Sequence, residues 1–165
     1  MVFNNQKNTM KKILSILSVS LLLVVNTGCI KGEDPCTPRS VQNEQAAMTT
    51  FATTNGINAT VHTSGINYEI ISQGSGVNPT LQSTLTVNYV GKYMDGSIFD
   101  QTTTTPAVFP LSNVIAGWQI ILPLIQKGGR IKMIIPSSLA YGCAGYRSVP
   151  PDAILFFDVT LVDVQ

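Results

Sequence analysis

The sequence predicts an α+β domain in which an antiparallel β-sheet is covered on one face by a short helix. Apolar and polar residues alternate over Thr84–Tyr93, as they do in a strand with one buried face. Asp95-Gly96 follows this segment, and the dipeptide favours a two-residue hairpin turn between antiparallel strands. The helical candidate over 117–126 is short and mostly apolar, so it can cover only part of a sheet.

The remaining elements follow from local patterns along the chain. Residues 41–54 carry apolar side chains three and four positions apart, which predicts a short amphipathic helix with Asn55-Gly56 as its C-cap. Pro123 must kink or restart the helix over 117–126, because proline cannot donate the helical hydrogen bond. Strands are expected at Asn67–Ser72, Thr84–Tyr93, Ile98–Asp100, Phe109–Leu111, Arg130–Ile135 and Ala153–Val164.

The composition excludes several classes of protein. Charged residues make up 12% of the 165 residues, against about 25% in a typical soluble protein, and the net charge is +1. Nucleic-acid binding needs a basic patch, so no nucleic-acid partner is expected. A hydrophobic content of 44% argues against disorder. Three cysteines and one histidine are too few for a zinc-finger type of site, so we expect neither a metal nor a cofactor.

Residues 1–28 are expected to be a lipoprotein signal peptide. Lys11 and Lys12 precede an apolar run over 13–25, which is shorter than the roughly 20 residues that a membrane-spanning helix needs. The run is followed by Asn26-Thr27-Gly28-Cys29. Small residues before a cysteine at this place resemble the lipobox of bacterial lipoproteins, in which the cysteine is acylated. Cys29 would then anchor the protein to a membrane of the cell envelope, facing the periplasm or the cell surface. An ordinary cleaved signal or an uncleaved anchor is the alternative.

Three further segments follow the expected lipid anchor. Residues 29–40 contain two prolines and a glycine among polar residues and are expected to form a flexible tether. Residues 41–64 are expected to form a helical lead-in, whose helix over 41–54 packs on or beside the main domain or serves as a dimerisation arm. Residues 65–165 are expected to form the main domain. Cys36 and Cys143 could pair in an oxidising compartment or stay free, because the sequence does not give their Cα separation.

The main domain contains a series of motifs that recur together in one known family. They are, in order, Val87–Gly91 (VNYVG), Asp95–Asp100 (DGSIFD), Val114–Trp118 (VIAGW), Ile134–Gly142 (IIPSSLAYG) and Val149–Val159 (VPPDAILFFDV). Their order and spacing resemble the FKBP-type peptidyl-prolyl cis/trans isomerases. The resemblance implies a half-open antiparallel sheet wrapped around a short α-helix, with an apolar pocket between them. It also implies that 65–165 is an isomerase domain that rotates Xaa–Pro bonds.

The resemblance further implies which residues form the pocket. The residues matched to catalysis are Tyr89, Phe99, Asp100, Trp118, Tyr141 and Phe157, and those matched to substrate binding are Val114, Ile115 and Val149. Trp118 would lie beneath the proline ring, Asp100 would face the carbonyl of the twisted amide, and Tyr141 would donate its hydroxyl from a flap. Phe156 and Phe157 are adjacent on a strand, so only one of them can face the pocket, and the alignment favours Phe157. Each of these residues could instead be an ordinary core or turn residue.

The sequence also departs from the family pattern. Ala107 stands near a place where members often carry an aromatic residue, and the loop Gln101–Thr105 lacks an arginine that some members pair with the pocket aspartate. The segment Cys143–Ser148 is short for a flap. The rim of the pocket is therefore expected to be more open and less aromatic than in the best-known members, and tight macrolide binding is in doubt.

Two functions are compatible with these observations. The first is an isomerase that assists the folding of exported proteins by acting on proline-containing unfolded or nascent chains. Such a reaction needs neither a nucleophile nor proton transfer, and His62 lies outside the isomerase domain. The alternative is a membrane-tethered module that binds proline-containing segments, or acts as a chaperone, with little turnover.

Overall fold

A seven-stranded antiparallel sheet dominates the computed structural model, which describes residues 36–165. The strands lie in the order β1-β2-β6-β7-β3-β4, and β5 also pairs with β3. They are β1 (Thr60–Val61), β2 (Asn67–Ser72), β3 (Thr84–Lys92), β4 (Ile98–Gln101), β5 (Ala107–Pro110), β6 (Arg130–Ile135) and β7 (Leu155–Val164). The expected signal peptide, Cys29 and the first part of the expected tether lie outside the described residues.

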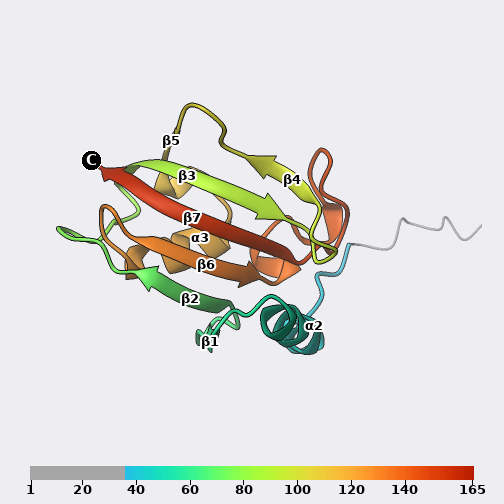
Figure 1. Cartoon of the computed structure of the whole chain (residues 1–165). Coiled ribbons are helices and arrows are strands. Elements are labelled where there is room, and N and C mark those ends of the chain that lie inside the picture. Colours follow the sequence, from blue (N-terminus) through green and yellow to red (C-terminus); the bar gives the residue numbers. More distant parts are fainter. Residues whose placement is uncertain (1–35) are drawn as a thin grey trace, which may run out of the picture. The chain divides into compact units, whose positions relative to one another are not determined.

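Two α-helices lie against opposite faces of this sheet (Figure 1). Successive side chains of a strand point to opposite faces, and β6 shows how the two helices use this alternation. Met133 belongs to the buried cluster that contains residues of α3 (Ala116–Ile121). Its neighbour Ile134 belongs to a second cluster that contains residues of α2 (Val41–Thr54). The sheet is therefore buried on one face by α3 and, at one end, on the other face by α2.

Short 3₁₀ turns connect the helices and strands around the sheet. They are η1 (Leu111–Asn113), η2 (Leu122–Leu124), η3 (Ser137–Leu139) and η4 (Gly142–Ala144). The last two belong to the connection between β6 and β7, residues 136–154, which we call the flap. None of the helices within residues 36–165 combines the length and the apolar character needed to cross a membrane.

The structure confirms the predicted fold class, an antiparallel sheet wrapped on a short helix. The predicted helix over 41–54 and the predicted strands Asn67–Ser72 and Arg130–Ile135 have the expected bounds. The apolar segment over 117–126 is broken as Pro123 requires, since α3 ends at Ile121 and a 3₁₀ turn follows. Within the expected helical lead-in, however, Thr60–Val61 forms β1, because its backbone pairs with the edge of β2.

A disulfide joins the first described residue to the flap. Cys36 and Cys143 are bonded with their Cα atoms 5.6 Å apart, within the usual range for such a bridge. Of the two states that the sequence leaves open, the structure therefore has the paired one. Close by, the Arg39 guanidinium forms an ion pair with Asp152 of the flap at 3.2 Å. The end of the expected tether is thus attached to the flap at two points.

Removal of this bridge should lower the stability of the protein. The two cysteines are 107 residues apart, so the bond closes a long loop and restricts the unfolded chain strongly. We expect the double substitution Cys36→Ser with Cys143→Ser to lower the free energy of unfolding by about 2–4 kcal/mol in urea titrations. The oxidised wild-type chain should lose the same amount when a reductant is added, whereas the double variant should not respond. A wild-type chain whose stability is unchanged by the reductant would contradict the pairing.

Candidate active site

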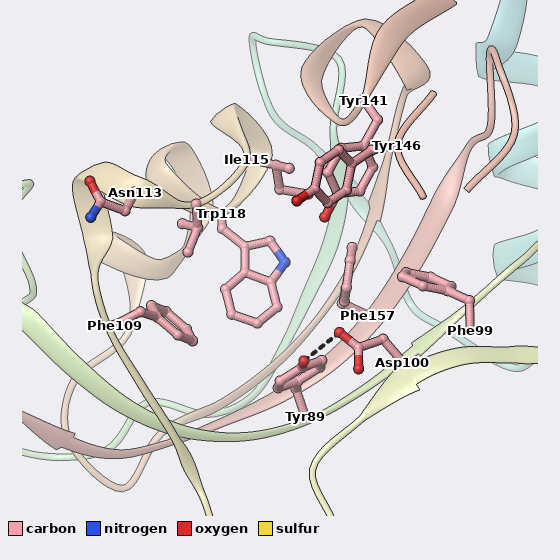
Figure 2. A pocket seen from close by; sticks show the side chains of 11 residues that line it. Tyr89, Phe99, Asp100, Phe109, Asn113, Ile115, Trp118, Tyr141, Tyr146 and Phe157 are labelled. Carbon is pink, nitrogen blue, oxygen red and sulfur yellow. Dashed lines mark hydrogen bonds between the residues drawn. The ribbon is translucent and has the colours of Figure 1, made fainter. Parts of the chain in front are cut away.

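A pocket of about 330 Å³ opens between α3, the sheet and the flap (Figure 2). Its size is at the lower end of the range for small-ligand pockets, about 300–1,000 Å³. The lining residues are Tyr89, Phe99, Asp100, Phe109, Asn113, Val114, Ile115, Trp118, Tyr141, Tyr146 and Phe157. Most of them are aromatic or aliphatic, and the polar groups are few, so the cavity suits an apolar ring that carries one or two hydrogen-bonding atoms.

Trp118 forms the floor because α3 lies very close to β6. A Cβ atom at Gly117 would come within 2.5 Å of the Ile135 side chain, so only glycine allows this approach. The indole is 5% exposed and meets the rings of Tyr89 and Phe157 edge-on, with centroids 5.3 and 5.2 Å away. Edge-to-face pairs of this kind are favourable contacts, so the floor has a fixed orientation.

The indole nitrogen of Trp118 is the polar group of this floor. Among the described residues, Trp118 Nε1 is one of the few buried side-chain nitrogens or oxygens without a hydrogen-bond partner. Figure 2 shows that it is directed toward the side of the cavity where Phe157 and Asp100 lie. A buried N–H without a partner is costly unless a ligand or water satisfies it. The cavity therefore offers a donor to a substrate carbonyl.

Phe99 and Phe157 form one wall, and a glycine makes room for them. Their rings meet edge-on with centroids 5.6 Å apart, over Gly91 of β3, where a Cβ atom would lie only 2.8 Å from the Phe99 ring. Phe156, the neighbour of Phe157 on β7, packs on the opposite face with Phe51 of α2. The alternation of side chains along β7 thus places Phe157 in the pocket, as the match of this segment to the family motif predicts.

Tyr89 and Asp100 are joined across the mouth of the pocket. The Tyr89 hydroxyl donates a hydrogen bond of 2.6 Å to the exposed Asp100 carboxylate. Burial raises the pKa of the Tyr89 phenol, and the hydrogen bond to Asp100 together with its negative charge raises that pKa further. The phenol therefore stays protonated at neutral pH and holds the carboxylate in one position.

The flap contributes two tyrosines to the rim. The rings of Tyr141 and Tyr146 are stacked with centroids 5.3 Å apart, and their hydroxyls point toward the cavity (Figure 2). Burial raises the pKa of the Tyr141 phenol, and the negative charge of Asp100 raises that pKa further. Tyr93 at the end of β3 donates a hydrogen bond of 2.8 Å to the Ser148 carbonyl and so ties the flap to the sheet.

The lip of the pocket comes from the turn that precedes α3. Ile115 caps the helix, and its carbonyl accepts the Trp118 N–H at 3.0 Å. Gln119 on the helix donates its side-chain N–H to the Val114 carbonyl at 2.7 Å. The helix therefore fixes both Trp118 at the floor and Val114 with Ile115 at the lip. All three residues belong to the VIAGW motif.

The structure brings together all but one of the residues expected in the site. The exception is Val149, which is 7% exposed within the core and is not part of the pocket lining. Val149 instead exchanges two backbone hydrogen bonds with Tyr146, and it thereby shapes the flap. The residues that line the pocket without having been expected are Phe109, Asn113 and Tyr146.

The rim of the pocket carries rings beyond those expected from the motifs. Ala107 contributes no ring, but Phe109 lies two residues further along β5 and thus on the same face. The Phe109 ring lies 5.6 Å from that of Trp118, and Tyr146 adds a ring on the flap. The period of two along a strand was the signal in the sequence that could have identified Phe109.

The lining of the pocket includes no histidine, cysteine or serine. His62 lies outside the pocket, where its Nδ1 atom makes a hydrogen bond of 2.9 Å with the Ser64 hydroxyl. No group of three His, Cys, Asp or Glu side chains within residues 36–165 could hold a metal ion. The pocket lining contains neither cysteine nor serine, so it can bind, orient and desolvate a substrate but offers neither nucleophile as an attacking group.

Comparison with known proteins identifies the family. A family model described as FKBP-type peptidyl-prolyl cis-trans isomerase matches residues 76–162, a range that contains every residue of the pocket lining. This chain belongs to that family. The antiparallel sheet packed on α3 is therefore the family's fold, as the motifs predict.

The relatives include bacterial proteins of greater length. FkpA of Escherichia coli, named as an FKBP-type peptidyl-prolyl cis-trans isomerase, is 42% identical over 117 residues, which cover 70% of this chain and 43% of FkpA. The crystal structure of FkpA aligns with a TM-score of 0.68 at 31% identity and covers 100% of this chain and 74% of that one. The crystal structure of a peptidyl-prolyl cis-trans isomerase from Pseudomonas syringae aligns with a TM-score of 0.64 at 31% identity and covers 78% of this chain and 98% of that one. The chain thus spans less than half the length of the curated FkpA.

The coupling of Tyr89 to Asp100 can be measured by titration. Asp100→Asn keeps an acceptor but removes the negative charge, so we expect the pKa of Tyr89 to fall while burial still holds it above the ordinary value of about 10. The measurement is the absorbance of tyrosinate against pH, with Tyr89→Phe identifying the transition. Because the folded pKa is raised, the stability that Tyr89 contributes is complete below about pH 10 and is lost as the pH rises through the folded pKa. An unchanged Tyr89 transition in Asp100→Asn would contradict the coupling.

Proposed function

We propose that the protein is a peptidyl-prolyl cis/trans isomerase that twists Xaa–Pro bonds without covalent chemistry in the pocket above Trp118. The observation that carries the proposal is the aromatic cavity of about 330 Å³ whose floor presents an N–H without a partner. Membership of the FKBP-type family supports the same activity. The proline ring occupies the cavity, and the polar groups of the rim face the amide that is to be rotated.

The rate enhancement follows from what rotation does to an amide. Rotation about an Xaa–Pro bond has a barrier of roughly 20 kcal/mol, because the amide loses its resonance at the twist. The planar amide is more strongly polarised than the twisted one, so water stabilises the planar form more. Transfer into a cavity walled by Phe99, Phe157 and Trp118 removes that water. The twisted form is therefore bound better than the planar form, which is the requirement for catalysis.

Particular polar groups then hold the twisted bond. The Ile115 backbone N–H and the indole N–H bind carbonyl oxygens on either side of the proline, and the Tyr141 hydroxyl donates from the flap. The Asp100 carboxylate, fixed by Tyr89, faces the carbonyl of the rotating amide. These groups are in place before the substrate arrives, so little reorganisation is needed during rotation.

The proposal places this isomerase on a membrane of the cell envelope. Acylation of Cys29 anchors the chain, and the clients are proline-containing unfolded or nascent exported proteins. The basic pair, the short apolar run and Gly28-Cys29 support the anchor. The disulfide between Cys36 and Cys143 is compatible with an oxidising compartment outside the cytoplasm.

The activity is tested with a proline-containing tetrapeptide and the full chain purified in mild detergent. We expect the wild-type chain to accelerate cis/trans exchange and Asp100→Val and Phe157→Leu to lower kcat/KM by about tenfold or more, since both alter the pocket. Phe156→Leu is the matched control, because Phe156 is buried next to Phe157 but contacts α2 instead of the pocket. Exchange at the uncatalysed rate with the wild-type chain would refute the isomerase. Tight binding of the peptide without acceleration would favour the proline-binding module.

The lipid anchor is tested by fractionation of cells that produce the full chain. We expect the wild-type chain in the membrane fraction and Cys29→Ala in the soluble fraction or retained as an unprocessed precursor, because the acylated sulfur would be missing. Cys36→Ala, seven residues later, is the control and should stay with the membrane. Mature Cys29→Ala protein that still sediments with membranes would show that acylation is not the anchor.

A further inference from the structure

A buried carboxylate on α2 lies outside the pocket lining. Glu44 is 3% exposed and lies on the same side of the helix as Met48, Phe51 and Ala52, the residues buried against the sheet. An apolar residue is expected on such a stripe, since a charged group loses its water when it is buried. Glu44 takes part in none of the salt bridges of the described residues. Its presence therefore needs a specific partner.

That partner is Ser137, the first residue of η3. Glu44 Oε2 accepts the Ser137 backbone N–H at 2.8 Å, and Glu44 Oε1 accepts the Ser137 hydroxyl at 2.6 Å. Ser137 is completely buried, and its carbonyl in turn accepts the Ala140 N–H at 3.0 Å. Two hydrogen bonds to one carboxyl group fix its orientation and satisfy both of its oxygens. The carboxylate thus fixes the point at which the chain leaves β6 and enters the flap.

Tyr141, whose hydroxyl points toward the cavity, follows four residues after Ser137. On its other side Cys143 is held by the disulfide to Cys36, and the Asp152 N–H is bonded to the Gly142 carbonyl at 2.9 Å. The tyrosine therefore lies between two attachments that both come from the segment 36–44. The same segment leads into α2, which packs on the face of the sheet opposite the pocket.

We propose that Glu44 is a positioning residue of the isomerase site, which through Ser137 fixes the flap so that the Tyr141 hydroxyl reaches the substrate. The proposal rests on the isomerase function proposed above. It assigns α2 a part in catalysis although α2 contributes no residue to the pocket lining. A purely structural Glu44 would attach α2 to the domain without affecting Tyr141.

The test compares two neighbouring side chains of α2 in the full chain. Glu44→Ala removes the attachment to the flap, whereas Gln45→Ala removes a bond of 2.7 Å from the same helix to Asn67 of β2, away from the flap. We expect Glu44→Ala to lower kcat/KM for the proline tetrapeptide about tenfold, mainly through kcat, because a displaced catalytic group is costly. Gln45→Ala should stay within about twofold of the wild type. Glu44→Gln, which keeps one acceptor, should lie between Glu44→Ala and the wild type.

A comparison in two backgrounds distinguishes an effect of Glu44 on the position of Tyr141 from an effect of Glu44 on the stability of the whole chain. In a Tyr141→Phe background the hydroxyl is already absent, so Glu44→Ala should cost little further activity. A loss of equal size in both backgrounds, or equal losses in Glu44→Ala and Gln45→Ala, would overturn the proposal. If Glu44→Ala does not fold, Glu44→Gln and Ser137→Ala are compared in the same two backgrounds, with the same criteria.

A second readout does not depend on activity. Because burial raises the pKa of Tyr141, a flap released by Glu44→Ala should expose the phenol and lower that pKa, as followed by NMR of the tyrosine ring. Gln45→Ala should leave the Tyr141 titration unchanged. If the wild-type chain has no isomerase activity, the proposed function fails, and this titration still decides whether Glu44 positions Tyr141. An unchanged Tyr141 pKa in Glu44→Ala would contradict the positioning role.

Discussion

The close approach of α3 to β6 is the contact on which the pocket depends. Gly117 lies against Ile135 without room for a Cβ atom, and this places the next residue, Trp118, beneath the cavity. The surrounding rings then pack edge-on around the indole and fix its orientation. If the helix lay further from the sheet, the indole would lose its contacts with the rings of Tyr89 and Phe157, and the floor of the cavity would change. The position of one backbone thus determines the shape of the whole site.

The opposite face of the sheet explains how the site is attached to the rest of the chain. Phe156 and Phe157 are neighbours on β7, yet one packs with α2 and the other lines the pocket. The segment before and within α2 also reaches the flap through Cys36, Arg39 and Glu44. Cavity, flap and N-terminal helix therefore form one connected structure, although α2 lies outside the lining. The non-covalent isomerase mechanism that we propose requires such a fixed arrangement.

The sequence predicts the parts of this structure that depend on local patterns. The alternation over Thr84–Tyr93 and the proline within 117–126 indicate a strand and a broken helix, and the structure has both. The motifs that resemble the family predict that Tyr89, Asp100 and Trp118 lie in one pocket, and the structure brings all three together. The flap is different, because its path depends on contacts between residues that are far apart in the sequence. Local spacing therefore does not predict that Tyr146 lines the pocket or that Val149 is buried beside it. It also does not predict the hydrogen bonds between Glu44 and Ser137, which are 93 positions apart.

The dependence of the pocket on the contact between α3 and β6 is tested most directly by adding a methyl group at Gly117. Gly117→Ala should push α3 away from Ile135 and lower kcat/KM for a proline peptide about tenfold or more, while the circular dichroism of the sheet persists. Combining it with Ile135→Ala removes the three atoms nearest to the added methyl group and should restore a substantial part of the activity. Wild-type activity in Gly117→Ala alone, with the chain fully folded, would contradict the claim that this contact sets the pocket.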